Sequence, residues 1–191
     1  MSISRPIATA LAAAGLAGVL VFGLSACSPG PGPKPSPTPT ASAEPIFASD
    51  EEALAAAVKA YEAYDKVSDS IINDGGADPE RIDAVVTARY APQLRDEFVA
   101  IAEAGLRSSG VATVDSVSLV SNAERDGLAT VSIYFCRDLS DARVLDKTGA
   151  DVTPEGREER VPSQGFFVSD APGSQTLLVD EVTRWSGENF C

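Results

Sequence analysis

Residues 128–136 read Leu-Ala-Thr-Val-Ser-Ile-Tyr-Phe-Cys and alternate apolar with polar side chains. Residues 111–120, Val-Ala-Thr-Val-Asp-Ser-Val-Ser-Leu-Val, have a similar period, and the intervening Asp126-Gly127 pair is typical of a tight hairpin turn. The pattern predicts an antiparallel hairpin. Because successive side chains of a strand point to opposite faces, Tyr134 and Cys136 are expected to lie on the face away from the core. The core face then holds Ala129, Val131, Ile133 and Phe135.

Further strands are predicted on the C-terminal side of this hairpin. Residues 143–145 form a short strand before the turn-forming sequence Asp-Lys-Thr-Gly at 146–149. Longer strands are expected near 160–168 and 176–185, with Gly173 marking the turn between them. The second half of the chain therefore predicts an antiparallel meander.

The chain on the N-terminal side of the hairpin has helical spacing instead. Ser49 and Glu52 form a capping box, in which each side chain satisfies an orphan amide at a helix start. Apolar residues then recur at three- and four-residue steps up to Asn-Asp-Gly-Gly at 73–76. Proline is favourable at the first position of a helix, so Asp78-Pro79 and Pro92 predict the starts of a second and a third helix.

Helices followed by an antiparallel meander indicate an α+β fold in a single domain, residues 46–191, with the helices packed on a strongly curved sheet. This order resembles the nuclear transport factor 2-like fold, a cone with a helical lid and a bent sheet. More specifically, the layout resembles small exported actinobacterial lipoproteins of that superfamily. The resemblance rests on Tyr61-Glu62-Ala63-Tyr64, on Ile133-Tyr134-Phe135-Cys136, on residues 144–152, on Trp185 and on Cys191.

The first 26 residues predict an export signal. Arg5 precedes an uncharged, mostly apolar run from Pro6 to Leu24, which is the order of charge and hydropathy in signal peptides. Leu24-Ser25-Ala26-Cys27 resembles the lipobox of bacterial lipoproteins. That resemblance implies a diacylglyceryl group on the Cys27 thiol and cleavage just before this residue. Two or three acyl chains would then anchor the protein at the extracytoplasmic face of the cell membrane. An uncleaved membrane anchor and a plain signal peptide with an incidental cysteine are the alternatives.

Residues 27–45 predict a disordered tether that begins with the lipidated Cys27. Positions 28–45 contain seven of the chain's 13 prolines and no large apolar residue, so no core can form there. Such a segment should be a stiff spacer of about 50–60 Å. A proline-rich ligand for a partner domain is the alternative interpretation.

Two cysteines remain once Cys27 is assigned to lipid. Cys136 and Cys191 form an even pair in an exported protein, where thiols oxidise, so a disulfide is expected between them. Metal binding would need more ligands than two cysteines in a chain without histidine, and redox-active pairs are more often close Cys-x-x-Cys motifs.

The composition excludes several classes of function. A net charge of -13 argues against a surface that binds nucleic acid. The absence of histidine removes the commonest general base and the commonest zinc ligand, and no cofactor is expected. The Asp146–Asp151 sequence lacks the alternating oxygen ligands of a calcium loop and predicts a plain turn, and the mixed charges of Glu155–Arg160 predict a solvated edge or loop.

Six residues are candidates for a pocket or a partner surface. Enzymes with the cone-shaped fold commonly place an Asp with a Tyr or His facing the cavity, so the resemblance suggests Asp65, Tyr61, Tyr64 and Tyr90. Tyr134 and Trp185 could line a ligand cavity or a partner surface. The competing interpretation is that the aromatic residues are core and that Asp65 belongs to a solvated helix face.

No catalytic signature is present in the sequence. The sequence therefore predicts a non-catalytic, membrane-anchored surface lipoprotein that binds another envelope protein or a small ligand. The alternative is a small-molecule carrier, or a cyclase- or isomerase-like enzyme that uses the cavity of the cone. A third interpretation is a protein that contacts peptidoglycan.

Overall fold

The structure is a computed structural model that describes residues 44–191. The predicted signal peptide, the predicted lipidation site Cys27 and the predicted tether up to residue 43 lie outside the described residues. Within residues 44–191, no helix combines the length and the apolar character needed to span a membrane.

The first helix, α1 (Asp50–Asn73), begins where the capping box predicts. The Ser49 hydroxyl accepts a hydrogen bond from the Glu52 amide at 3.3 Å. The Glu52 carboxylate accepts one from the Ala48 amide at 2.9 Å, one residue earlier than in the standard box. The helix ends at Asn73, and the following Gly75 and Gly76 both have positive φ and donate to carbonyls of the last turn.

The second predicted helix is a single 3₁₀ segment, η1 (Pro79–Ala84). Pro79 takes the first helical position as expected, but the Asp78 side chain forms no cap, because its backbone adopts a left-handed conformation with φ 50°. The third predicted helix is present as α2 (Ala91–Ala104), which contains Pro92 near its start and ends at Gly105. The first half of the domain therefore has two α-helices and one 3₁₀ helix rather than three α-helices.

Four strands form the main antiparallel sheet in the order β2-β3-β5-β6. Their bounds are Thr113–Arg125 for β2, Leu128–Asp138 for β3, Arg160–Ser169 for β5 and Leu177–Arg184 for β6. Asp126 and Gly127 both have positive φ between β2 and β3, as a two-residue hairpin turn requires. The predicted meander is thus confirmed for these strands.

A second, two-stranded sheet pairs β1 (Arg107–Ser109) with β4 (Arg143–Leu145). The short strand at 143–145 was predicted from sequence, whereas β1 was not. The Arg-Ser-Ser sequence of β1 has no apolar alternation, so only its pairing with β4 makes it a strand.

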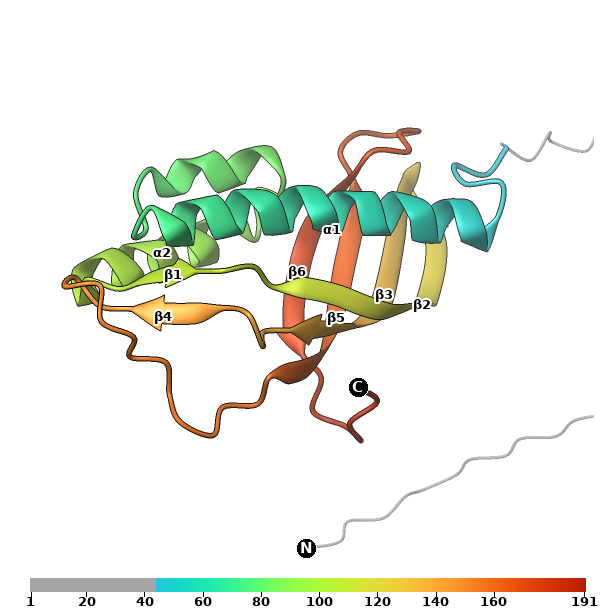
Figure 1. Cartoon of the computed structure of the whole chain (residues 1–191). Helices are drawn as coiled ribbons and strands as arrows, with labels where there is room; N and C mark the ends of the chain where they lie inside the picture. The colour runs from blue at the N-terminus through green and yellow to red at the C-terminus, as the bar shows by residue number, and fades with distance from the viewer. Residues whose placement is uncertain (1–43) are drawn as a thin grey trace, which may run out of the picture. The chain divides into compact units, whose positions relative to one another are not determined.

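Helix α1 contacts all four strands of the main sheet, and Figure 1 shows it crossing them on one side. The fold class is α+β, as predicted, with the core between α1 and this face of the sheet. The rings of Tyr61 on α1 and Phe135 on β3 lie 4.4 Å apart between their centroids. The largest side chains that are fully buried in this core are Ile71, Ile82, Val131, Ile133, Phe135, Phe167 and Val179.

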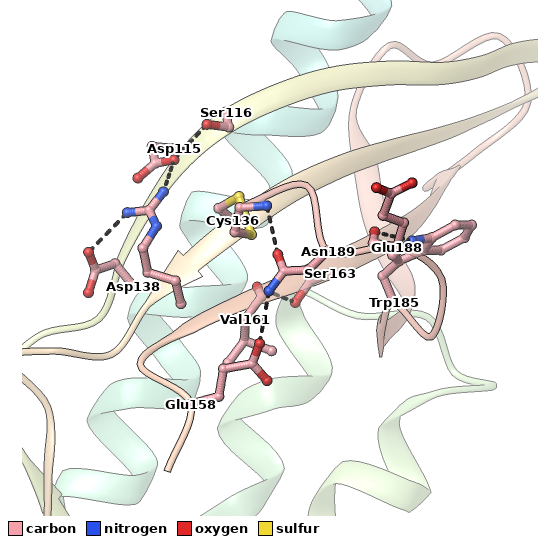
Figure 2. The surroundings of a disulfide bond; sticks show 12 residues. Asp115, Ser116, Cys136, Asp138, Glu158, Val161, Ser163, Trp185, Glu188 and Asn189 are labelled. Carbon is pink, nitrogen blue, oxygen red and sulfur yellow. Dashed lines mark hydrogen bonds and ion pairs between the residues drawn. A yellow bond between two sulfur atoms is a disulfide. The ribbon is translucent and has the colours of Figure 1, made fainter. Parts of the chain in front are cut away.

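The C-terminal segment covers the opposite face of the sheet (Figure 2). Cys136 is fully buried and forms a disulfide with Cys191, the predicted pair, with 5.6 Å between their Cα atoms. Asn189 donates to the Glu158 carboxylate at 3.0 Å and accepts from the Cys191 amide at 2.8 Å. The last residues are therefore fixed to β3 by a covalent bond and to the 146–159 loop by a hydrogen bond.

Candidate functional site

An apolar cleft lies between α1 and the strands β2 and β3, with a volume of about 260 Å³. Its floor is made of Ile133 and Phe135 from the core face of β3. Valines of α1 and β2 form its walls, and Tyr61, Glu62 and Asp65 bring polar groups to one side of it. The lining residues of this apolar cleft are Val58, Tyr61, Glu62, Asp65, Thr113, Val114, Val117, Ile133 and Phe135.

A bulge in β2 shapes the wall of the cleft. The β2–β3 register shifts between Asp115 and Ser118, and Ser116 adopts a left-handed conformation with φ 55°. Regular alternation would send Val117 away from the face that holds Val114, but the bulge turns both valines toward the core. Ser116 donates to Asp115 at 2.7 Å, and Arg160 of β5 donates to the same carboxylate at 2.7 Å (Figure 2). The backbone strain of Ser116 therefore coincides with the wall of a cavity, where such strain is often found.

The polar side of the cleft centres on the Asp65 carboxylate. Tyr61, one turn earlier on α1, donates to Oδ1 of Asp65 at 3.5 Å. The guanidinium of Arg137 forms an ion pair with the same oxygen at 3.5 Å. Asp65 is thus half-buried and paired, and the prediction that it belongs to a solvated helix face is wrong.

Arg137 is a residue of this site that the sequence analysis missed. It lies on β3 opposite Val114 of β2 and Val161 of β5, and it follows Ile133 and Phe135 on the same face of the strand. The sequence signal for Arg137 was its position, because this charged residue continues the core-facing alternation of Ile133 and Phe135. The Nε atom of Arg137 is buried and has no hydrogen-bond partner among residues 44–191.

Burial sets the protonation of these groups. It raises the pKa of the Tyr61 phenol well above its usual range, although Arg137 opposes the shift. It also raises the pKa of Asp65, again against Arg137, while the neighbouring Asp69 adds to the rise. Burial alone would lower the pKa of Arg137, but the facing Tyr61 and Asp65 raise it. Tyr61 is therefore a protonated hydrogen-bond donor at neutral pH, and Arg137 is a fixed cation.

Tyr64 and Tyr90 lie outside the lining of the cleft. The Tyr64 ring packs against Tyr61 with 5.8 Å between centroids, and Tyr90 is almost fully buried at the start of α2. Burial raises the pKa of both phenols. These two tyrosines pack in or against the core beside the site. For them, the competing interpretation that the aromatic candidates are core residues is confirmed.

Tyr134 and Trp185 lie on the other face of the sheet. The rings of Tyr134 and Trp185 are 4.8 Å apart, and Phe190 lies 5.5 Å from Tyr134. The Trp185 indole donates to the Glu188 carbonyl at 3.2 Å, which folds the C-terminal segment back on itself (Figure 2). The six candidate residues therefore do not form one site, because Tyr61 and Asp65 line the cleft while this pair belongs to the disulfide side.

A second hollow, the acidic groove, continues from the cleft along α1. Its volume is about 510 Å³, and it shares Glu62 and Asp65 with the cleft. Arg81 already neutralises Asp74 at one end of the groove, with 2.9 Å between the charged atoms. The lining residues of the acidic groove are Glu62, Asp65, Lys66, Asp69, Ser70, Asn73, Asp74, Gly110 and Val111.

A third hollow lies on another side of α1 and is larger, about 560 Å³. Alanines of α1 and residues 175–177 line most of it. Its one carboxylate, Glu52, is already used in the helix cap. The apolar cleft, which has a half-buried charge pair beside it, is therefore the better candidate site.

The Asp146–Asp151 sequence is a turn in which Asp146 satisfies backbone groups. Its carboxylate accepts from the Thr148 amide at 2.8 Å, from the Thr148 hydroxyl at 2.7 Å and from the Ala150 amide at 3.0 Å. In the described part of the chain, no group of three or more His, Cys, Asp or Glu residues is arranged to hold a metal ion.

No protein-family model matches the chain, and no curated protein sequence matches it either. Among solved structures, it is similar to the intermembrane-space region of the chloroplast protein ARC6, with a TM-score of 0.49 and 13% identity over 70% of this chain and 97% of that one. It is also similar to a protein from Catenulispora acidiphila, with a TM-score of 0.41 and 13% identity over 70% of this chain and 93% of that one.

Proposed function

We propose that the described domain is the non-catalytic binding module of a lipid-anchored cell-surface protein, and that it recognises another envelope protein through the apolar cleft. The single observation that supports binding is this cleft, which is open and apolar and has the Tyr61, Asp65 and Arg137 groups already positioned beside it. Sites for ligands combine apolar walls with a few fixed polar groups in this way.

The anchoring part of the proposal rests on the sequence. The lipobox at 24–27 and the proline-rich tether would place the domain outside the membrane on two or three acyl chains. We also propose membership of the nuclear transport factor 2-like superfamily of exported actinobacterial lipoproteins, on the order of helices and strands.

The charge pair argues against proton-transfer chemistry in the cleft. The Asp65 carboxylate is ion-paired with Arg137, which opposes the rise in its pKa, so the carboxylate already has a partner. The pKa of Tyr61 is raised by burial, so its phenol neither ionises nor gives up its proton readily near neutral pH. Both groups are better suited to orienting a bound partner than to moving a proton.

In-cell photo-crosslinking with the full chain tests this function. A photoreactive amino acid replaces Val117 in the cleft or, as a control, Thr130 on the opposite face of β3. We expect a protein adduct in the membrane fraction from position 117 and none from position 130. Equal adducts from both positions, or none from position 117, would overturn recognition through the cleft. Palmitate labelling tests the anchor separately, since the label should disappear in Cys27→Ala.

A second candidate function is a small-molecule carrier or a cyclase- or isomerase-like enzyme. It is favoured by one observation, the raised pKa of the Asp65 carboxyl at the side of a cavity. Native mass spectrometry of the exported protein distinguishes the two functions. A small molecule that is retained by the wild type and lost in Val117→Trp, which fills the cleft, would favour the carrier or enzyme.

A further inference from the structure

The apolar cleft and the acidic groove form one continuous recognition surface along α1. They share Glu62 and Asp65. Val58, Glu62, Asp65 and Asp69 follow one another at steps of three and four residues, which places them on the same helix face. This face changes from apolar to acidic along the helix.

The distance between the apolar cleft and the acidic groove sets the length of a segment that can occupy both. The cleft is centred near residues 61–62 of α1 and the groove near residue 68. At a rise of 1.5 Å per residue, the two centres are about 10 Å apart. An extended chain covers that distance in about three residues.

The carboxylates of the groove are not fully neutralised by the domain's own cations. Arg81 pairs with Asp74, and Arg137 pairs with Asp65. Lys66 lines the groove, is exposed and forms no ion pair with the other described residues. Glu62 and Asp69 are therefore without an ion-paired cation in the described part of the chain. Burial raises the pKa of Asp69, although Arg137 opposes the shift. A cation of a binding partner near Asp69 would lower the free-energy cost of burying its negative charge.

The far wall of the groove suits the stem of a long basic side chain. Val111 is 62% exposed there, next to Gly110, so an apolar surface lies opposite the carboxylates. Lysine and arginine bury their methylene stems on such surfaces and keep the charged end in a polar environment.

We infer that the surface binds a protein segment with an apolar side chain for the cleft and a lysine or arginine about three residues away for the groove. This inference rests on the proposed function and specifies the partner. The cleft volume of about 260 Å³ lies below the range of about 300–1,000 Å³ that is typical of pockets for drug-sized molecules, and it suits a single side chain better. The net charge of -13 also favours encounter with a basic partner.

Peptide binding to the full-length lipoprotein in detergent tests the inference. The probe is a capped peptide in which leucine and lysine are separated by two glycines, and the matched peptide has glutamate in place of lysine. Line broadening and shifts of the peptide's NMR signals report binding in the millimolar range. We expect the lysine peptide to bind at least about tenfold more tightly than the glutamate peptide. Equal binding of the two peptides, or binding of neither, would overturn the inference.

Two variants separate this inference from the proposed function. Glu62→Gln/Asp69→Asn removes both unpaired carboxylates and leaves the Asp65 pair with Arg137 intact. Glu103→Gln/Asp96→Asn on α2 changes the net charge equally, at exposed positions away from the groove. In Glu62→Gln/Asp69→Asn alone, we expect the affinity for the lysine peptide to fall about tenfold and the crosslinked adduct from position 117 to weaken. An adduct that is unchanged in this variant would refute the basic segment while leaving the binding function in place, whereas no adduct in any variant would refute the binding function itself.

Discussion

The Nη2 atom of Arg137 lies 3.5 Å from Oδ1 of Asp65, and this ion pair connects the end of β3 to the middle of α1. Asp69, one turn further along the helix, is also within electrostatic reach of the guanidinium. The side chains of Arg137 and Asp65 are 32% and 19% exposed. A single cation is therefore ion-paired with one half-buried carboxylate and only partly offsets the burial of a second, Asp69.

Replacing Arg137 with methionine should lower the free energy of unfolding by about 2 kcal/mol at pH 7, because it leaves Asp65 and Asp69 without their cation. The loss should be smaller at pH 4. Removing the cation raises the pKa of both carboxyls further in the folded state, while the unfolded value stays near about 3.9. The folded variant then binds more protons than the unfolded chain, so its stability falls as the pH rises above about 4. Urea unfolding at both pH values measures the difference.

The control for this prediction is Arg95→Met. Arg95 pairs with Asp83 at 3.6 Å, and both side chains are more than a third exposed. Such surface pairs contribute little, so a loss of less than about 0.5 kcal/mol is expected at either pH. Similar losses in the two variants would mean that the Arg137 pair has no special role.

The elements that the sequence predicted are those whose signals are local. The β2–β3 hairpin follows from alternation around Asp126-Gly127, and α1 follows from its cap and its spacing. The strand β1 has no signal of its own and exists only through its register with β4, 34 or more residues away. The Asp78-Pro79 sequence is typical of a helix start with an N-cap aspartate. In the structure, however, the backbone of Asp78 is left-handed, and its side chain forms no cap hydrogen bond.

The candidate site could be predicted only in part for a similar reason. Tyr61 and Asp65 were candidates from the sequence, but their hydrogen bond is shown only by the structure. Their partner Arg137 is more than 70 residues away, and its place opposite Val114 depends on the strand register and on the bulge at Ser116. Alternation alone cannot report a bulge, because the bulge changes which residues face the core.

Loss of the disulfide should destabilise the domain. The bond between Cys136 and Cys191 closes a loop across 55 residues, so Cys191→Ser should lower the free energy of unfolding by about 2–4 kcal/mol. The chain's one tryptophan, Trp185, packs on Tyr134 beside the bond, so its emission should shift to longer wavelength. A reductant should change the wild type and leave Cys191→Ser unaffected. Equal stability of wild type and variant without reductant would contradict the prediction.

Acid should weaken the contact between β6 and the chain before α2. Arg89 donates to both carboxylate oxygens of Asp180, at 3.0 and 2.6 Å, and Thr87 donates to one of them at 2.6 Å. Arg89 and Thr87 hold the pKa of Asp180 below its usual value, so its contribution is present above about pH 4 and is lost as the pH falls through the lowered value. Asp180→Asn should therefore cost about 1 kcal/mol at pH 7 and clearly less at pH 2. Urea unfolding at each pH tests this, and an equal cost at both would contradict it.

Gly110, in the wall of the acidic groove, should tolerate no side chain. Its φ is +81°, and an added Cβ would lie within about 2 Å of the Asp141 carbonyl oxygen, so Gly110→Ala combines backbone strain with a clash against main chain. Gly156 has φ +70° with nothing within 4 Å of such a Cβ, so Gly156→Ala measures the strain alone. Thermal unfolding should show a loss of about 1 kcal/mol for Gly156→Ala and about 3 kcal/mol for Gly110→Ala. Equal losses would show that the approach of residue 141 is not tight, and that the groove wall can move without cost.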